Sequence, residues 1–134
     1  MTPAEPRRLA YAFLRVTTGC VFLFYGIGKL QEGAGAFAAG LVEGFEKTWL
    51  PSFAVRAFGL FLPFLEVASG TLLALGLFTR VGIGIASALI VVLTFGQTIL
   101  GHSDGVAHNL IYALVLYILM RHADENGYAL DQKR

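Results

Sequence analysis

Residues 81–100 read VGIGIASALIVVLTFGQTIL and contain no charged side chain. A helix of about 20 mostly apolar residues crosses the hydrocarbon layer of a bilayer, which is about 30 Å thick. This stretch therefore predicts a transmembrane helix. Gly82 and Ala86, and likewise Gly84 and Ala88, are small residues one helical turn apart. Such pairs let membrane helices approach closely, either within one chain or between two chains.

Three further apolar segments flank this one. We expect spans at residues 9–30, 57–78 and 106–122, of which the last is near the lower limit of length. The chain has 134 residues, of which 56% are hydrophobic and 14% charged. A typical soluble domain has about 25% charged residues, so lipid must solvate most of this surface. The sequence predicts an all-α fold, a single membrane domain over residues 1–134 that forms a four-transmembrane-helix bundle.

Residues 34–50, between the first two expected spans, have a different pattern. Charged residues alternate there with apolar ones, and Pro51 ends the segment. The pattern favours a short interfacial helix with Trp49 at the level of the lipid headgroups. An ordinary ordered loop is the alternative. The apolar residues at helical spacing are Phe37, Leu41, Val42, Phe45 and Trp49.

The distribution of Lys and Arg predicts the orientation. With the N-terminus inside, six cationic residues lie on the inner side and three on the outer side, which favours cytoplasmic N- and C-termini in a bacterial cytoplasmic (inner) membrane. The inner residues are Arg7, Arg8, Arg80, Arg121, Lys133 and Arg134, and the outer ones are Lys29, Lys47 and Arg56. The net charge of +1 and the absence of a basic stripe argue against a nucleic-acid partner.

Cysteine and histidine usage limits the redox chemistry. Cys20 is the only cysteine, so the chain has no dithiol of its own. His102, Asp104 and His108 have a spacing that matches no familiar metal site, and we expect no metal. Haem is not expected either, because the third histidine, His122, falls at the opposite membrane face.

Glu66 falls near the middle of the second expected span, three residues after Pro63. An ionisable group at this depth costs roughly 2.5–3.5 kcal/mol on insertion scales. Arg15 in the first span is the expected partner, at a depth that its long side chain can bridge. The pair is either structural or part of a buried proton-accepting or ligand-binding site, and the structural interpretation is favoured.

A second polar group gathers toward the outer ends of the spans. Its side chains suit a pocket for the headgroup of a quinone, whose two carbonyls need hydrogen-bond donors and whose reduction needs protons. They equally suit a hydrated interface, and Ser103 or Asp104 is a plausible N-cap of the last helix. The group comprises Tyr25, Lys29, Gln97, His102, Asp104, His108 and Asn109.

Five short motifs in order along the chain carry a family resemblance. They are residues 14–16 (LRV), 26–30 (GIGKL), 65–70 (LEVASG), 75–80 (LGLFTR) and 126–131 (NGYALD). Together they resemble the DoxX family. The resemblance implies a four-helix membrane bundle related to the DoxD-like subunit of thiosulfate:quinone oxidoreductase, and distantly to the vitamin K epoxide reductase fold. The chain lacks the cysteine pairs of the latter, so disulfide exchange is not carried over. Arg15, Lys29 and Glu66 are carried over as catalytic positions.

We therefore expect an integral membrane subunit of a quinone-linked oxidoreductase, with quinone as cofactor and oxidation of a sulfur compound as its context. The residues expected to bind the quinone are Tyr25, Gln97, His102, His108 and Asn109. The alternative is a non-catalytic membrane anchor or assembly subunit for a redox partner, because one cysteine and four helices leave little catalytic equipment. A small transporter is a third hypothesis, since intramembrane charges also line ion paths. The expected partners are the lipid bilayer, a redox subunit and a second copy of the chain.

Overall fold

The computed structural model describes residues 4–126 and residue 129, and the regular secondary structure of this part of the chain is all helical. Four helices are long and apolar enough to cross a membrane, so the expected four-span, all-α architecture is confirmed. Most of the tail motif, together with Lys133 and Arg134, lies outside the described residues. The elements are α1 (Ala4–Glu32), α2 (Ala34–Gly44), α3 (Ser52–Leu75), α4 (Thr79–Leu100), α5 (Ser103–Arg121) and a 3-10 turn, η1 (Ala123–Glu125). The four spanning helices are α1, α3, α4 and α5.

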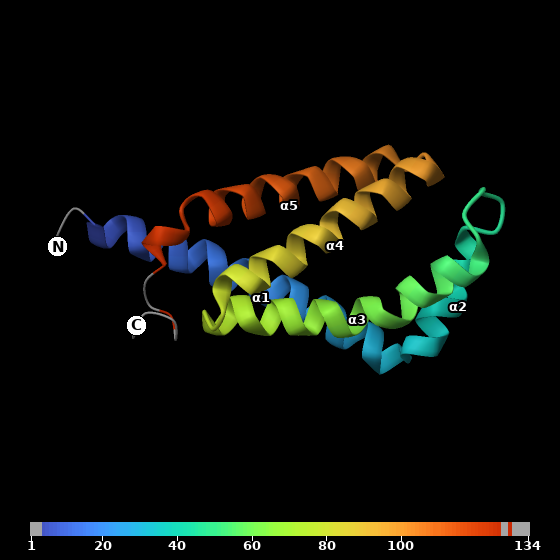
Figure 1. Ribbon diagram of the computed structural model, residues 1–134, viewed down its shortest axis with the longest axis horizontal. Coiled ribbons are helices and arrows are strands. Elements are labelled where there is room, and N and C mark those ends of the chain that lie inside the picture. The colour runs from blue at the N-terminus through green and yellow to red at the C-terminus, as the bar shows by residue number, and fades with distance from the viewer. Residues whose placement is uncertain (1–3, 127–128, 130–134) are drawn as a thin grey trace.

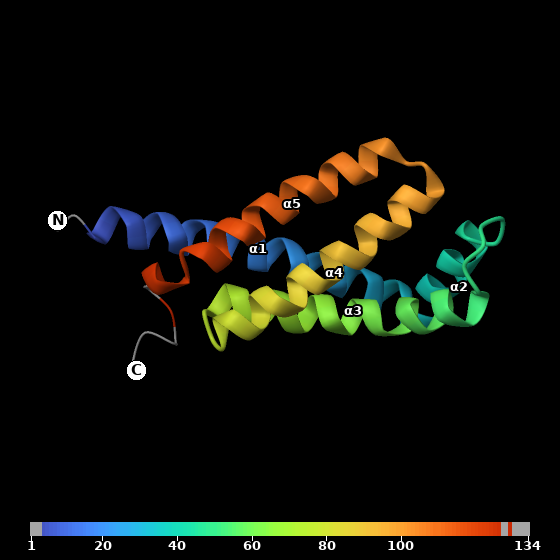
Figure 2. The same cartoon turned by 45° about the horizontal axis from the view of Figure 1, so that its top comes forward.

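The helices form two pairs (Figure 1). Helices α1 and α3 lie side by side and antiparallel, and they make the most extensive contact in the molecule. Helices α4 and α5 form a hairpin in which α4 packs on α3, while α5 touches α1 at few points. The view in Figure 2 shows α2 against the first half of α3, at the end of the bundle away from the start of α1 and the end of α5.

The second spanning helix begins and ends earlier than the 57–78 expected from hydropathy. It begins at Ser52 because Pro51 has extended backbone angles and precedes the first helical residue. It ends at Leu75 because Gly76 adopts φ 69°, a left-handed conformation that stops helices. The turn to α4 therefore lies at residues 76–78, before the two residues 79–80 that the expected spans 57–78 and 81–100 leave between them, and Phe78 also has a positive φ of 46°.

Glycines bring α1 and α3 into backbone contact. A Cβ atom on Gly70 would meet the backbone nitrogen of Leu23 and lie 2.7 Å from the carbonyl oxygen of Gly19. A Cβ atom on Gly26 would lie 2.9 Å from the carbonyl oxygen of Pro63. In membranes, where no hydrophobic drive pulls helices together, such close approach is a main source of contact energy. This glycine contact holds the two longest helices together.

The small residues of α4 divide into two sets. Gly82 and Ala86 are buried, and a Cβ atom on Gly82 would lie 3.0 Å from Leu72 of α3, so this pair packs within the chain. Gly84 and Ala88 are exposed, and nothing lies within 4 Å of a Cβ atom built on Gly84. Only the first pair thus serves packing inside one bundle.

Helix α2 is shorter than the expected 34–50 helix, because it ends at Gly44 and a series of turns follows. In these turns the hydroxyl of Thr48 donates a hydrogen bond to the carbonyl of Phe45 at 2.6 Å. Ala38, which is fully buried, anchors α2 against Gly59 of α3. Trp49 is 71% exposed and lies in the turns rather than on a helix.

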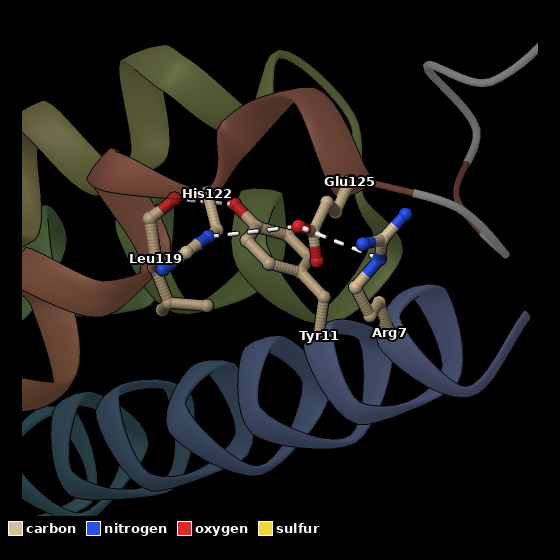
Figure 3. Close-up of polar contacts among 5 residues, drawn as sticks. All are labelled: Arg7, Tyr11, Leu119, His122 and Glu125. Carbon is tan, nitrogen blue, oxygen red and sulfur yellow. Dashed lines mark hydrogen bonds and ion pairs between the residues drawn. The ribbon is translucent and has the colours of Figure 1, made fainter. Parts of the chain in front are cut away.

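Polar contacts link α1 to the end of α5 and to η1 at the end of the bundle where α1 begins (Figure 3). The hydroxyl of Tyr11 donates a buried hydrogen bond of 2.7 Å to the carbonyl of Leu119. This carbonyl lies in the last turn of α5, where helix carbonyls have no intrahelical partner. Glu125 lies 4.0 Å from Arg7 and 3.6 Å from His122. These ion pairs are partly exposed and contribute little, so the tyrosine is the main link.

We predict that Gly70→Ala destabilises the bundle, because the added methyl group pushes the backbones of α1 and α3 apart. Overpacking of this kind costs about 1–3 kcal/mol. Gly84→Ala is the matched control, as its methyl group meets nothing and alanine is the better helix former. Thermal unfolding in detergent measures both. Equal midpoints for the two variants would contradict the assignment of this contact.

Candidate functional site

A polar cavity of about 160 Å³ lies between α1, α3, α4 and α5. Apolar side chains form its walls on α4 and part of α1, and polar ones come from α1, α3 and α5. Tyr25 and His108 are exposed at its open side. The lining residues are Val21, Phe22, Tyr25, Lys29, Glu66, Ile90, Leu93, His108, Asn109 and Tyr112.

Two of the lining residues, Lys29 and Glu66, form an ion pair. The Lys29 Nζ atom is 2.9 Å from the Glu66 Oε1 atom, and the Glu66 side chain is only 5% exposed. The close contact of Gly26 with Pro63 brings the two helices together beside the pair. Side chains of a helix lean toward its N-terminus, so Lys29 reaches back along α1 to the level of Glu66. The Glu66 Oε1 atom is itself fully buried, so the Lys29 ammonium is the charge that compensates it.

Two aromatic rings flank the Lys29 ammonium group. Its nitrogen lies 5.6 Å from the centre of the Tyr25 ring and 5.5 Å from that of Phe37. Both distances are within the range of a cation–π attraction. Phe37 belongs to α2, so the short helix contacts the site directly.

The opposite wall comes from α5. His108 and Tyr112 are one turn apart on one face, with ring centres 5.1 Å apart. Tyr112 also makes an edge-to-face contact of 5.8 Å with Phe22 of α1. Asn109 lies beside His108 in the lining. The cavity thus combines an ion pair with hydroxyl, amide and imidazole groups.

Five of the eight expected site residues meet in this cavity. Those that do are Tyr25, Lys29, Glu66, His108 and Asn109.

The other three expected site residues lie elsewhere. Gln97 lines a different cavity and packs on Gly105. His102 is exposed and occupies the N-cap position of α5, without a capping hydrogen bond from its side chain. The expected cap at Ser103 or Asp104 is therefore wrong, since α5 begins at Ser103.

Arg15 is the third, and its expected pairing with Glu66 is wrong. Arg15 is 1% exposed, and its Nε donates a 2.9 Å hydrogen bond to the carbonyl of Leu73. Leu73 lies seven residues beyond Glu66, which is roughly 10 Å along the helix. The Arg15 side chain leans toward the start of α1, away from Glu66. Its Nη1 also donates to Asn126 at 2.8 Å, and Asn126 in turn donates to Thr79 at 3.0 Å.

Sequence reasoning missed Tyr112 and Phe37 as parts of the site. Tyr112 follows His108 by four residues, a spacing that places both on one helix face, so the pattern could have included it. Phe37 was assigned to an apolar face of the surface helix. Its contact with Lys29 depends on how α2 folds back on α3, which no local pattern reveals.

A second cavity, of about 240 Å³, lies between the α2–α3 connection, α3 and α4. Gln97 supplies the one polar side chain among its lining residues, and Leu93 is shared with the polar cavity. Its lining residues are Leu41, Phe45, Leu50, Ala54, Val55, Phe58, Val92, Leu93, Phe95, Gly96 and Gln97.

We predict that Lys29→Met and Glu66→Gln each destabilise the protein by about 3 kcal/mol, because each leaves one buried charge or polar group without its partner. The double variant should lose much less than the sum of the two. A double-mutant cycle of unfolding in detergent measures this coupling. Arg15→Met combined with Glu66→Gln is the control cycle, and its effects should add. Coupling of Glu66 to Arg15 rather than to Lys29 would refute the pairing.

Comparison with known families tests the expected relationship. No curated protein sequence and no solved structure matches the chain. Residues 7–109 match the family model described as methylamine utilisation protein MauE. The expected membership of the DoxX family is therefore wrong, and the expected oxidation of a sulfur compound loses its basis with it. The motifs behind it were strings of three to six mostly apolar or glycine residues, which unrelated membrane helices share, and its tail motif lies beyond the match. The match covers α2, α3 and α4, nearly all of α1 and the start of α5, and the chain belongs to the MauE family.

Proposed function

We propose that this protein is a membrane subunit of a redox system for methylamine utilisation, and that its polar cavity binds the headgroup of a quinone. The description of the family supports the first part. The second part is supported by one observation above all, the Lys29–Glu66 ion pair exposed to a cavity that also holds hydroxyl and amide groups.

A quinone ring needs apolar walls for its faces and donors for its two carbonyl oxygens. In this cavity the ammonium of Lys29, the hydroxyls of Tyr25 and Tyr112 and the amide of Asn109 are donors. Phe22 and Leu93 are apolar neighbours for the ring. The chemistry of the lining thus suits a flat molecule with a polar atom at each end better than a simple hydrocarbon.

Reduction of a quinone to a quinol takes two electrons and two protons. Glu66 and His108 supply a carboxyl and an imidazole group to the cavity lining, the two kinds of side chain that most often transfer protons in enzymes, and His108 is exposed to the outside of the bundle. The electrons would come from a partner redox protein, because the chain has a single cysteine and no dithiol to relay them. The protein would then supply the quinone site and the proton route.

The orientation belongs to the same proposal. The excess of Lys and Arg near the chain ends favours cytoplasmic termini in a bacterial inner membrane. The chain enters α1 and leaves α5 at the same end of the bundle (Figure 1), as an even number of spans requires. The open side of the polar cavity then lies in the outer half of the membrane.

A non-catalytic anchor or assembly subunit is the second candidate, and the packing of α5 favours it. The buried residues of α5 are Leu116 and Leu119, both in its second half. Its first half exposes Leu110 and Ile111 to lipid or to a partner, and Leu114 just beyond the midpoint is exposed as well. Mass spectrometry of the protein released gently from its native membrane separates the candidates. A bound quinone supports the quinone subunit, and a tight protein partner without quinone supports the anchor.

We predict that Lys29→Ala and Tyr25→Phe each weaken quinone binding by about tenfold, because each removes a hydrogen-bond donor to a quinone carbonyl. Glu66→Gln should weaken binding as well, because it removes the counter-ion that holds the Lys29 ammonium in place. Quenching of the single tryptophan, Trp49, by a short-chain quinone in lipid nanodiscs measures the affinity.

Matched controls are Lys47→Ala and Glu46→Gln, which change exposed residues outside the cavity. Tyr25→Phe removes only a hydroxyl and leaves the ion pair intact, so it separates loss of binding from loss of folding. Unchanged affinity in all three folded cavity variants would exclude this cavity as the quinone site.

A further inference from the structure

The apolar cavity is built into the fold. Gly96 of α4 leaves room for the ring of Phe45, because a Cβ atom on Gly96 would lie 3.2 Å from the ring's Cζ atom. Phe45 is only 8% exposed and follows the last residue of α2. Trp49 and Phe95 make an edge-to-face contact of 6.2 Å at the same end of the bundle. The turns after α2 thus cover an open space between α3 and α4.

The space adjoins the polar cavity. Leu93 lines both, with Ile90 on the polar side and Gly96 and Gln97 on the apolar side. On α3, Glu66 lines the polar cavity, and Phe58 lines the apolar one eight residues earlier. The two cavities therefore follow one another along the contact between α3 and α4, and a ligand that passes Leu93 touches both.

We propose that the apolar cavity binds the hydrocarbon chain of the quinone whose headgroup occupies the polar cavity. This inference rests on the proposed function. The lining, apolar apart from Gln97, offers dispersion contacts and few hydrogen bonds, which is what an isoprenoid or alkyl chain requires. Because the polar cavity adjoins it, a hydrocarbon tail attached to a quinone ring fits this space better than a free hydrocarbon does.

Packing, and not escape from water, provides the binding energy of the chain. Lipid tails are as apolar as the cavity, so moving the chain from the bilayer gains no hydrophobic free energy. The atoms that line an empty cavity lack dispersion contacts on one side, and a ligand that fills the cavity restores those contacts. The gain is modest, and it depends on the volume and shape of the cavity.

The test compares two ligands in nanodiscs, a methylated benzoquinone without a side chain and the same ring with a decyl chain. Ala54→Phe fills the cavity from α3, and Val92→Phe fills it from α4. The controls are Ala57→Phe and Val91→Phe, at exposed positions of the same helices outside the lining. Binding is followed by Trp49 quenching. The ratio of variant to wild-type affinity is compared for each ligand, which cancels partitioning into lipid.

We expect each filling variant to lower the affinity for the decyl quinone by about fivefold, which corresponds to ~1 kcal/mol. The affinity for the ring without a chain should stay unchanged. The control variants should bind both ligands as the wild type does. If the filling variants bind both ligands normally, the chain lies elsewhere or a lipid acyl chain fills the cavity, and the inference is overturned while the quinone site stands. If the filling variants lower the affinity for both ligands equally, the inference is also overturned. If neither ligand binds the wild type, the proposed function fails and this inference with it.

Discussion

The close approach of α1 and α3 is the constraint on which the rest of the structure depends. Gly19, Gly26 and Gly70 remove the side chains that would hold the two helices at an ordinary distance. Within this contact lie Arg15 and Glu66, the two most deeply buried charged residues of the described part of the chain, on facing helices. Each finds a partner there, Arg15 on the backbone of α3 and Glu66 on Lys29 of α1. A wider separation of the helices would leave both charges in an apolar surrounding, where they are costly.

The same contact explains why the site is a cavity and not a packed core. The glycines pack α1 tightly against α3, and α5 makes only few contacts with α1. Tyr11 closes the gap between α1 and α5 at one end of the bundle, through its bond to Leu119. Toward the other end, α5 supplies His108, Asn109 and Tyr112 across a space that no apolar side chain fills. Polar groups from three helices thus face the same cavity, and within it Lys29 of α1 and Glu66 of α3 are in direct contact.

Much of the fold could be predicted from composition and hydropathy, because a bilayer leaves few solutions for four apolar segments of this length. The polar grouping was also largely predictable, since residues at corresponding depths on neighbouring spans must lie near one another. The partner of Glu66 was not. Arg15 and Lys29 both lie within reach in depth, and the choice depends on the register of the glycine contact and on the direction in which side chains lean.

Two other errors have local causes. Helix α2 was expected to continue to residue 50, since its apolar spacing persists through Phe45 and Trp49, but the chain turns after Gly44. Hydropathy also placed the start of α3 after Arg56, although an arginine near the end of a membrane helix can extend its charged group to the interface. In both places the pattern identified the apolar residues and not the helix ends: α2 ends at Gly44, with Phe45 as its cap, and the extended backbone of Pro51 sets the start of α3.

The position of Lys29 in the chain has a consequence for how the protein enters the membrane. The lysine belongs to the first spanning helix and the glutamate to the second. During synthesis, the cation that pairs with Glu66 therefore precedes α3 along the chain, and α3 meets its counter-ion on a helix that was made before it. Insertion of α3 as an isolated helix would expose an unpaired carboxylate to lipid, at roughly 2.5–3.5 kcal/mol. The order of the helices along the sequence makes the ion pair an aid to the assembly of the bundle as well as a part of its finished site.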